Sequence, residues 1–177
     1  MKKLLLILLC LPMIYSCGES KSHYYKLGVS YFNNGEFKYA IDAYTDAIEL
    51  DNKYTNAYIN RGVIFIEIGN YKDAMKDLSK AISLDPNDAQ IYYNRGILYD
   101  KLKDFSNAID DYTRAINRRP NYSQAYYNRG VSKFNSMLPA FAGQSQVYSK
   151  LEACIDLAMG CDGGEVGSCE KWNRYCN

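Results

Sequence analysis

The sequence contains a single histidine, His23, among its 177 residues. It has almost no net charge, because 21 lysines and arginines face 20 aspartates and glutamates, for a formal charge of +1 at pH 7. A lone histidine disfavours metal sites and catalysis that depends on imidazole. The balanced charge gives no electrostatic reason to expect nucleic-acid binding. We therefore expect a protein that is not an enzyme, with no metal, no cofactor and no nucleic-acid partner.

Disorder is also disfavoured by what the chain contains. Apolar residues make up 47% of it and charged residues 23%, and 18 residues are tyrosines. That composition is typical of a chain that buries a core. The length supports either one medium domain or an array of small repeats.

Long apolar runs are missing, apart from a short one at the start. Within Met1–Ser16, two lysines precede roughly ten apolar residues, which suits the core of a signal peptide and is too short for an ordinary membrane-spanning helix. The run ends at Ser16, followed by Cys17, and this resembles the signal of bacterial lipoproteins, in which the cysteine is acylated. We therefore expect residues 1–16 to be a signal peptide, Cys17 to carry lipid, and residues 17–20 to form a linker. The alternative is an ordinary secretory signal that leaves Cys17 without lipid.

The lipoprotein resemblance also implies a location. Acylation with two or more chains gives stable membrane attachment. We expect a lipid-anchored protein of the bacterial cell envelope, held at the outer membrane on its periplasmic side or at the cell surface.

One short string recurs along the chain with a period of 34 residues. It is AYINRG at 57–62, IYYNRG at 91–96 and AYYNRG at 125–130, with a weaker copy, HYYKLG, at 23–28. Within a unit, Ala74, Leu78 and Ala81 follow one another at intervals of four and three, so they share one face of a helix. Turn residues such as Gly69 and Asn70 divide the apolar segments. The pattern predicts repeated pairs of helices.

The recurring aromatic, glycine, alanine and proline positions resemble the tetratricopeptide repeat. On this resemblance we assign units to residues 21–54, 55–88 and 89–122, with the first helix of a fourth unit reaching residue 134. The resemblance implies an all-α, right-handed superhelical solenoid of helix-turn-helix repeats, closed by a C-terminal capping helix. It also implies a protein or peptide partner.

The fourth unit departs from the pattern. Lys133 occupies a position where the other units carry an aromatic residue, and residues 135–145 interrupt the unit. We expect these residues to form an insertion loop that adds nine residues, with the second helix resuming near Gln146. There, Leu151, Ile155 and Ala158 repeat the intervals of four and three that mark a packing face.

Four of the six cysteines lie in the segment 146–177, symmetrically about a Gly-rich turn at 162–168. Residues placed symmetrically about a turn face each other in a helical hairpin, so we predict the disulfides Cys154–Cys176 and Cys161–Cys169. Pairing Cys154 with Cys161 would bridge seven residues of helix, about 10.5 Å, beyond the roughly 7 Å that a disulfide spans. A four-cysteine zinc site is the alternative. The tail also weakly resembles the cysteine-bearing Sel1-like relatives of these repeats.

The resemblance further implies a concave groove lined by the first helices of successive units. Its facing residues lie two and three positions before the repeated glycine. The first of these columns holds Tyr25, Ile59, Tyr93 and Tyr127, and the second holds Lys26, Asn60, Asn94 and Asn128. We take Tyr25, Tyr93, Tyr127 and the whole second column as candidate peptide-binding residues, because an asparagine both donates and accepts hydrogen bonds to a peptide unit. Sugar-transferase and motor-adaptor members of the family carry such an asparagine ladder.

A structural role for the ladder is the alternative, in which the asparagines tie neighbouring helices together. Three arginines that follow them are expected to make ion pairs between repeats: Arg61, Arg95 and Arg129. A family subtype binds chaperone tails through a two-carboxylate clamp, but of the matching positions here, which hold Tyr25, Val29, Asn60, Gln90 and Asn94, only Asn60 agrees.

The leading hypothesis is therefore a non-catalytic adaptor that binds an extended peptide or a helix of a partner in its groove. One rival is an envelope hydrolase acting on peptidoglycan or β-lactams, for which Ser168 and Lys171 match the spacing SxxK without any partner motif. The other is a structural lipoprotein that associates with itself.

Overall fold

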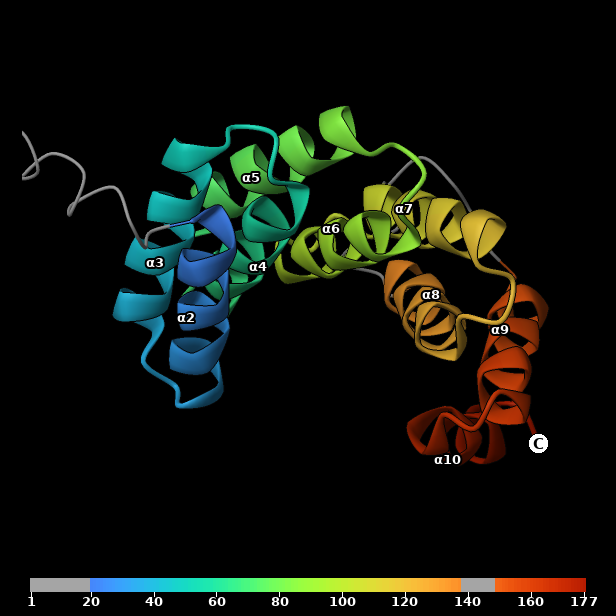
Figure 1. Ribbon diagram of the computed structural model, residues 1–177. Helices are drawn as coiled ribbons and strands as arrows, with labels where there is room; N and C mark the ends of the chain where they lie inside the picture. The colour runs from blue at the N-terminus through green and yellow to red at the C-terminus, as the bar shows by residue number, and fades with distance from the viewer. Residues whose placement is uncertain (1–19, 138–148) are drawn as a thin grey trace, which may run out of the picture.

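The computed structural model describes residues 20–137 and 149–177. The expectations for the signal peptide, for Cys17, for most of the insertion loop and for a helix resuming near Gln146 lie outside these residues. Every regular element within the described part is a helix, and together the helices form an arch (Figure 1). They are α2 (Lys21–Asn33), α3 (Phe37–Leu50), α4 (Thr55–Glu67), α5 (Tyr71–Leu84), α6 (Ala89–Lys101), α7 (Phe105–Arg118), α8 (Ser123–Ser136), α9 (Lys150–Asp162) and α10 (Val166–Tyr175). The predicted all-α solenoid is confirmed.

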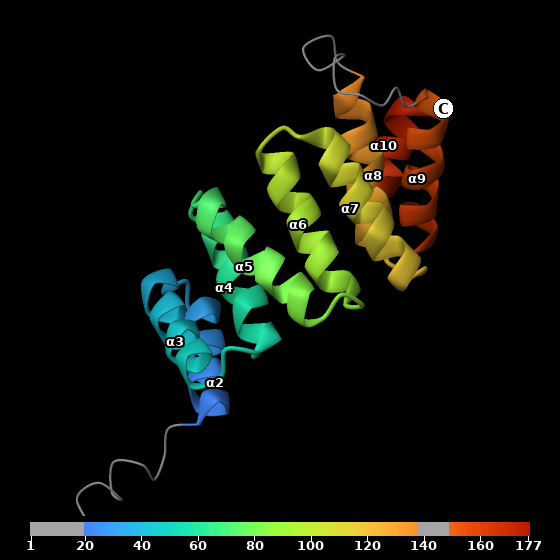
Figure 2. The same cartoon turned by 90° about the horizontal axis from the view of Figure 1, so that it is seen from above.

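Consecutive helices pair into hairpins, α2 with α3, α4 with α5, α6 with α7 and α8 with α9. The even-numbered helices lie along the inner side of the arch and the odd-numbered ones along its outer side (Figure 1). From above, the hairpins follow one another as a staggered row (Figure 2). None of the described helices is long and apolar enough to span a membrane.

The turns inside the hairpins require a left-handed backbone residue. Gly35 and Gly69 occupy this position in the first two units, with φ of 76° and 77°. The third unit places Lys103 there, with φ of 62°. Glycine adopts this conformation without steric cost, whereas a side chain makes it unfavourable.

Helices of one hairpin approach each other closely at the repeated glycine. A Cβ atom added to Gly28 or Gly96 would lie 2.6 Å from the ring of Tyr44 or Tyr112, respectively. In the second unit the facing residue is Leu78, and a Cβ atom added to Gly62 would lie 3.1 Å from its Cγ. The packing partner thus alternates between tyrosine and leucine along the array, and this alternation shapes the inner face.

The three repeated arginines form ion pairs within their own units, not between units as expected. Arg61 Nε and Nη2 donate to both carboxylate oxygens of Asp77, at 2.7 and 2.9 Å, from α4 to α5. The same two-bond pairs join α6 to α7 and α8 to α9, between Arg95 and Asp111 and between Arg129 and Asp156. The link between units is a hydrogen bond instead, from Arg61 Nη1 to Thr45 Oγ1 at 2.8 Å.

The helix register in the fourth unit differs from the prediction. The paired arginine and aspartate are 16 residues apart in the second unit and 27 apart in the fourth, so the insertion comprises 11 residues rather than nine. Asn135 and Ser136 belong to α8 instead of the loop, and α9 begins at Lys150. The packing face of α9 consists of Ala153, Leu157 and Gly160, all buried.

The residues expected on that face are therefore on another side of the helix. Leu151 is 70% exposed and Ile155 is 53% exposed, while Ala158 is half-buried. Intervals of four and three occur twice in α9, two residues apart, and the spacing alone does not distinguish them. The structure selects the row whose small residues fit against Gly130, because a Cβ there would lie 3.0 Å from the Ala153 carbonyl oxygen.

Two disulfides join α9 to α10. They are Cys154–Cys176, with a Cα–Cα distance of 5.7 Å, and Cys161–Cys169, at 4.7 Å. These are the pairings that the symmetric cysteine spacing predicts, and they consume the four sulfurs that a zinc site would need. The helix α10 contributes one buried side chain, Ser168. The disulfides are thus a major part of what holds it against α9.

Candidate functional site

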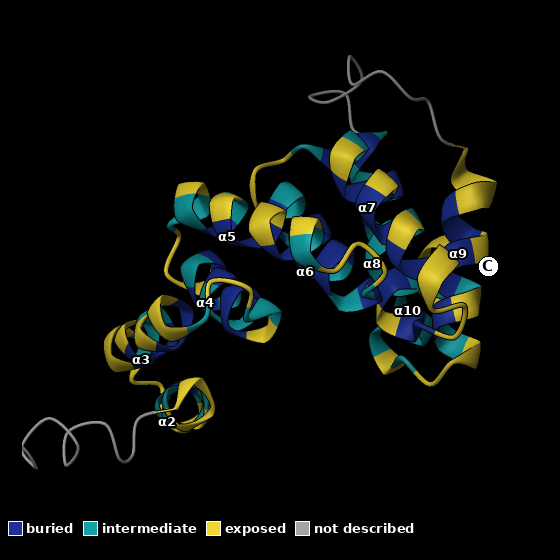
Figure 3. Ribbon diagram, turned by 45° about the horizontal axis from the view of Figure 1, so that its top comes forward, coloured by how far each residue is buried: buried dark blue, intermediate teal, exposed yellow. Residues whose placement is uncertain are grey.

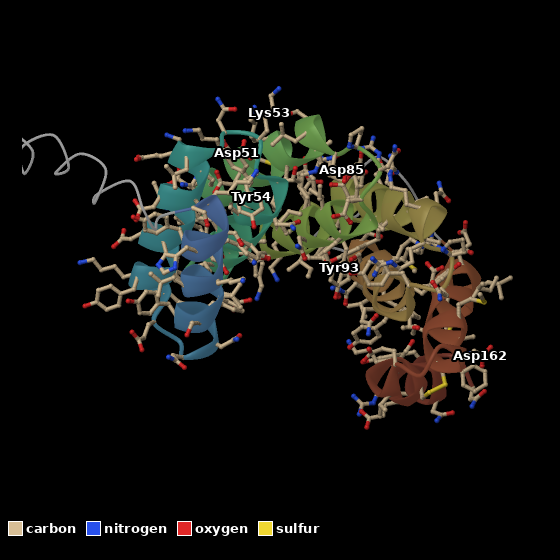
Figure 4. All side chains as sticks on the ribbon, viewed as in Figure 1. Asp51, Lys53, Tyr54, Asp85, Tyr93 and Asp162 are labelled. Atoms are coloured by element: carbon tan, nitrogen blue, oxygen red, sulfur yellow. A yellow bond between two sulfur atoms is a disulfide. The ribbon has the colours of Figure 1, made fainter. Side chains whose placement is uncertain are left out.

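Two tyrosine clusters form part of the inner side of the arch. In the first, the ring of Tyr25 lies 5.7 Å from that of Tyr44 and 5.2 Å from that of Tyr54. In the second, Tyr93 lies 5.9 Å from Tyr112 and 4.8 Å from Tyr122. Figure 4 labels Tyr54, which belongs to the first cluster, and Tyr93, which belongs to the second. Two of the candidate binding tyrosines are thus packed into clusters.

The asparagines of the next units bond to these clusters. Asn60 Nδ2 donates to the hydroxyls of Tyr25 and Tyr44, both at 3.2 Å. Asn128 Nδ2 donates in the same way to the hydroxyl of Tyr93, at 3.2 Å. These are the bonds between neighbouring helices that a structural role for the ladder requires. An asparagine whose amide already donates to tyrosine retains its carbonyl oxygen as an acceptor for a ligand.

Asn94 has different surroundings from Asn60 and Asn128, because the preceding unit has two apolar residues in place of the cluster tyrosines. The positions equivalent to the cluster tyrosines hold Ile59 and Leu78, which offer no hydroxyl. Asn94 is 6% exposed and accepts a hydrogen bond from Gln90 Nε2 at 3.1 Å. Gln90 in turn accepts from the Tyr122 hydroxyl at 2.8 Å. The three asparagines therefore do not form a uniform ladder.

Burial favours the protonated form of several of these tyrosine hydroxyls. It raises the pKa of Tyr44 and of Tyr93 above the ordinary tyrosine value, and it raises the pKa of Tyr122 to about 12. The pKa of Tyr112 is raised by burial and by the neighbouring Asp100 carboxylate. These hydroxyls are neutral hydrogen-bonding groups at any physiological pH, so they can fix side chains but cannot serve as bases.

Two other candidate residues lie at opposite ends of the arch. Lys26 is exposed on α2. Tyr127 is half-buried beneath α10, and the ammonium of Lys171 lies 5.3 Å from the centre of its ring. The capping helix thus covers part of the surface that the sequence assigned to ligand.

A row of aliphatic residues on the inner helices was not found from the sequence. The residue after each repeat glycine is Val29, Val63, Ile97 or Val131, and all four are half-buried. The signal that could have revealed them is the same period of 34 residues, read one position further along. The row runs through all four units.

Two hollows open at the ends of this row. The first, of about 80 Å³, lies between α2 and α4 and is lined by Val29, Val63 and Asn60, together with Phe32 and Tyr44. The second, of about 300 Å³, lies between α8 and α10 and is lined by Val131, Phe134, Asn135, Lys171 and Tyr175. Apolar side chains and carboxamides therefore dominate both, and the second adds one ammonium group.

A half-buried carboxyl group, that of Asp100, lies near the middle of the arch. Asp100 accepts hydrogen bonds from the Tyr112 hydroxyl and from Ser132 Oγ, each at 2.7 Å. The pKa of this carboxyl is raised above its ordinary value, because the effect of burial is larger than the opposing effect of the two hydrogen bonds. Because Asp100 joins α6 to α7 and α8, its geometry indicates a structural role between two units.

Comparison with known families places the repeats. Models of the tetratricopeptide repeat match residues 24–54 and 89–122, and a model described as TPR repeat matches residues 64–103. No curated protein matches the chain.

Solved structures share the architecture. A crystal structure of MamA has a TM-score of 0.71 and 23% identity, covering 93% of this chain and 86% of MamA. The TPR domain of Arabidopsis OM64 has a TM-score of 0.61 and 23% identity, over 63% of this chain and 93% of that one. The first TPR of Spaghetti (RPAP3), bound to the HSP90 peptide SRMEEVD, has a TM-score of 0.63 and 23% identity, over 65% of this chain and 91% of that one. At these identities the likenesses show the fold alone.

Proposed function

Because the chain belongs to the tetratricopeptide-repeat family, we propose that it is a protein–protein interaction scaffold whose inner face holds an extended segment of a partner. The observation that carries this proposal is the aliphatic row from Val29 to Val131, which runs through four units and has a hollow near each end. A row of half-buried aliphatic side chains, repeated along a concave surface, is what an extended apolar segment needs to bury its own side chains.

The chemistry of the inner face indicates the class of segment. The row and its hollows are lined by aliphatic, aromatic and carboxamide side chains, with Lys171 at one end. Carboxamides such as Asn60 pair with a backbone without selecting a charge. The partner segment is therefore uncharged along most of its length, with apolar side chains that enter the hollows.

An acidic tail is a poor fit. The Spaghetti TPR structure holds the peptide SRMEEVD. The positions that form a carboxylate clamp in the family hold Tyr25, Val29, Gln90 and Asn94 here, besides Asn60, so no lysine or arginine lies among them. An acidic peptide would lose its hydration at this face without gaining cationic partners.

A non-catalytic role is part of the proposal. Ser168, the first residue of the SxxK match, is fully buried and its hydroxyl donates to the Leu157 carbonyl oxygen. A nucleophile must reach its substrate, and this hydroxyl faces the interior of the hairpin. The position of Ser168 therefore supports an adaptor over a hydrolase.

The cellular setting is proposed from the start of the sequence. A signal at residues 1–16 followed by an acylated Cys17 would attach the scaffold to the bacterial cell envelope, at the outer membrane. Mass spectrometry of the protein from membranes tests this, since acylation adds the mass of the lipid to a chain beginning at Cys17. A Cys17→Ala variant should lose the added mass and leave the membrane fraction; an unmodified Cys17 would contradict the anchor.

Photo-crosslinking in cells tests the scaffold itself. A photoreactive residue at Ile97, in the middle of the row, should give one discrete adduct with the partner. The matched control is Lys76, which is exposed on the outer helix α5. An adduct from Ile97 but not from Lys76 supports the proposal, whereas equal adducts from both positions, or none from Ile97, would contradict it.

A further inference from the structure

The outer face of α9 differs in chemistry from that of the other outer helices. One row of positions, spaced four residues apart, faces outward on each of them. On the first three helices it carries Lys38, Asp42 and Asp46; Lys72, Lys76 and Lys80; and Ser106, Asp110 and Arg114. On α9 the equivalent residues are Leu151, Ile155 and Met159, which are 70%, 53% and 45% exposed. Figure 3 shows exposed residues along this helix.

Among the described residues, this apolar row lies outside the face through which α9 packs. The helix packs through Ala153, Leu157 and Gly160 against α8 and α10, and through its disulfides. Three large apolar side chains at positions that are polar or charged on the other outer helices leave apolar area in water, which is unfavourable unless it is covered. A row spaced by four residues is the ridge through which one helix packs against another.

A hollow continues the row at the end of α9. It has a volume of about 390 Å³ and is lined by Met159 and Asp162 of α9 and by Pro120, Asn121, Ser123, Tyr126 and Gly163. Figure 4 shows Asp162 at the end of α9 beside α10. An apolar wall, an aromatic ring and a carboxylate together suit the aliphatic stem and charged head of a lysine or arginine.

The charges at the rim select among possible occupants. Near its start the row is flanked by Lys150 and Glu152, whose charges offset each other, and Asp162 lies at its end; all three are exposed. The carboxylate of Asp162 would repel an anionic lipid surface, and a second copy of α9 would bring a second Asp162 carboxylate to the contact. A cationic partner is favoured by the same argument.

We propose that the outer face of α9 docks an amphipathic helix of a partner protein, with its apolar side on Leu151, Ile155 and Met159 and a lysine or arginine in the hollow beside Asp162. This surface lies on the opposite side of the arch from the aliphatic row on the inner helices. The two sites are therefore independent, and one scaffold can hold two proteins.

A designed peptide tests the proposal on the full chain in detergent solution. The probe is a fluorescent helical peptide with leucine at every fourth position and an arginine three residues after the last leucine. The control peptide has the same sequence with glutamate in place of the arginine. Fluorescence anisotropy should show tighter binding of the arginine peptide, and Ile155→Lys should raise its dissociation constant at least about tenfold.

Matched variants make the result specific. Ile155→Lys gives α9 the residue that α5 carries at the same position, Lys76, so the helix should remain folded, as circular dichroism would verify. Asp162→Lys should reverse the preference, so that the glutamate peptide binds more tightly. Lys76→Glu on the outer face of α5 should leave peptide binding unchanged.

Three results would overturn the proposal. One is failure of the arginine peptide to bind, and another is binding that Ile155→Lys or Asp162→Lys leaves unaltered. The third is a concentration-dependent dimer, or adsorption to phosphatidylglycerol vesicles, that Ile155→Lys abolishes, because it would assign the face to a second copy or to lipid. None of these results bears on the inner face, so the scaffold proposal fails or survives separately.

Discussion

Removing the carboxylate of Asp77 should destabilise the array far more than removing the whole ion pair to which it belongs. Asp77 and its partner Arg61 have side chains that are only 3% and 15% exposed, joined by two hydrogen bonds. The first unit has no such pair, because the equivalent positions hold Leu27 and Ala43. The chain thus contains its own apolar version of the same contact.

The magnitudes follow from burial. Asp77→Ala leaves a partly buried guanidinium with one remaining bond, to Thr45, and the loss of a buried partner typically costs about 3–5 kcal/mol. Arg61→Leu combined with Asp77→Ala leaves no uncompensated charge and reproduces the first unit. Replacing a buried ion pair by apolar residues is often nearly neutral, so we expect the double variant to lose less than about 2 kcal/mol.

Urea unfolding followed by circular dichroism at 222 nm measures both variants against the unaltered chain. The loss of the Asp77 single variant should exceed that of the double variant by more than about 1 kcal/mol, so that adding Arg61→Leu restores stability. A double variant as unstable as the single one, or a neutral Asp77→Ala, would refute this account of the pair.

Three further predictions concern other contacts. Gly96→Ala should cost about 1–3 kcal/mol in an unfolding experiment, because the new Cβ would lie 2.6 Å from the fully buried Tyr112 ring; an unchanged midpoint would contradict this close approach. Replacing Cys154 and Cys176 by serine should cost roughly 2–4 kcal/mol and abolish amide-exchange protection in α10 before the other helices, whereas retained protection there would show that the remaining Cys161–Cys169 disulfide and packing are enough to hold it. Asp100 has a raised pKa, so the folded state binds its proton more tightly than the unfolded state, and its stabilising effect falls as the pH rises above about 4. Measured against Asp100→Asn, the stability difference should therefore decrease with rising pH, and a difference independent of pH would contradict the burial argument.

The repeat period predicts most of this fold. Each 34-residue unit carries the glycine, alanine and bulky positions at fixed spacing, so the hairpins from α2 to α7 follow from local pattern. The cysteine symmetry about the turn likewise predicts both disulfides. These features depend on residues close together in sequence, where spacing alone fixes which side chains meet.

The register of the fourth unit does not follow from spacing. Two rows of residues in α9 have the same intervals of four and three. The sequence favours the row with the larger apolar residues, Leu151 and Ile155, as the packing face, and this prediction is wrong. The choice depends on Gly130 and on the Arg129–Asp156 ion pair, contacts between α8 and α9 that join residues far apart in the sequence. Single-sequence patterns carry no information on such a contact.

The sequence predicts which positions line the groove, but only part of the contacts that the residues at these positions make. The period assigns Asn60, Asn94 and Asn128 to one column, yet their partners depend on whether the facing residue is Tyr44, Leu78 or Tyr112. The three asparagines occupy equivalent positions, but their hydrogen bonds differ because the residues facing them alternate between tyrosine and leucine. The aliphatic row emerges only once the inner side of each helix is known.

The most direct test of the scaffold is the affinity of the partner segment for a chain altered in the middle of the aliphatic row. Once crosslinking from Ile97 identifies that segment, calorimetric titration compares the unaltered chain with Ile97→Glu and with Lys76→Glu. A charge in the row should weaken binding at least about tenfold, because the buried carboxylate gains no partner, while the change on α5 should have no effect. Equal affinities for all three chains would show that the inner face is not where the partner binds.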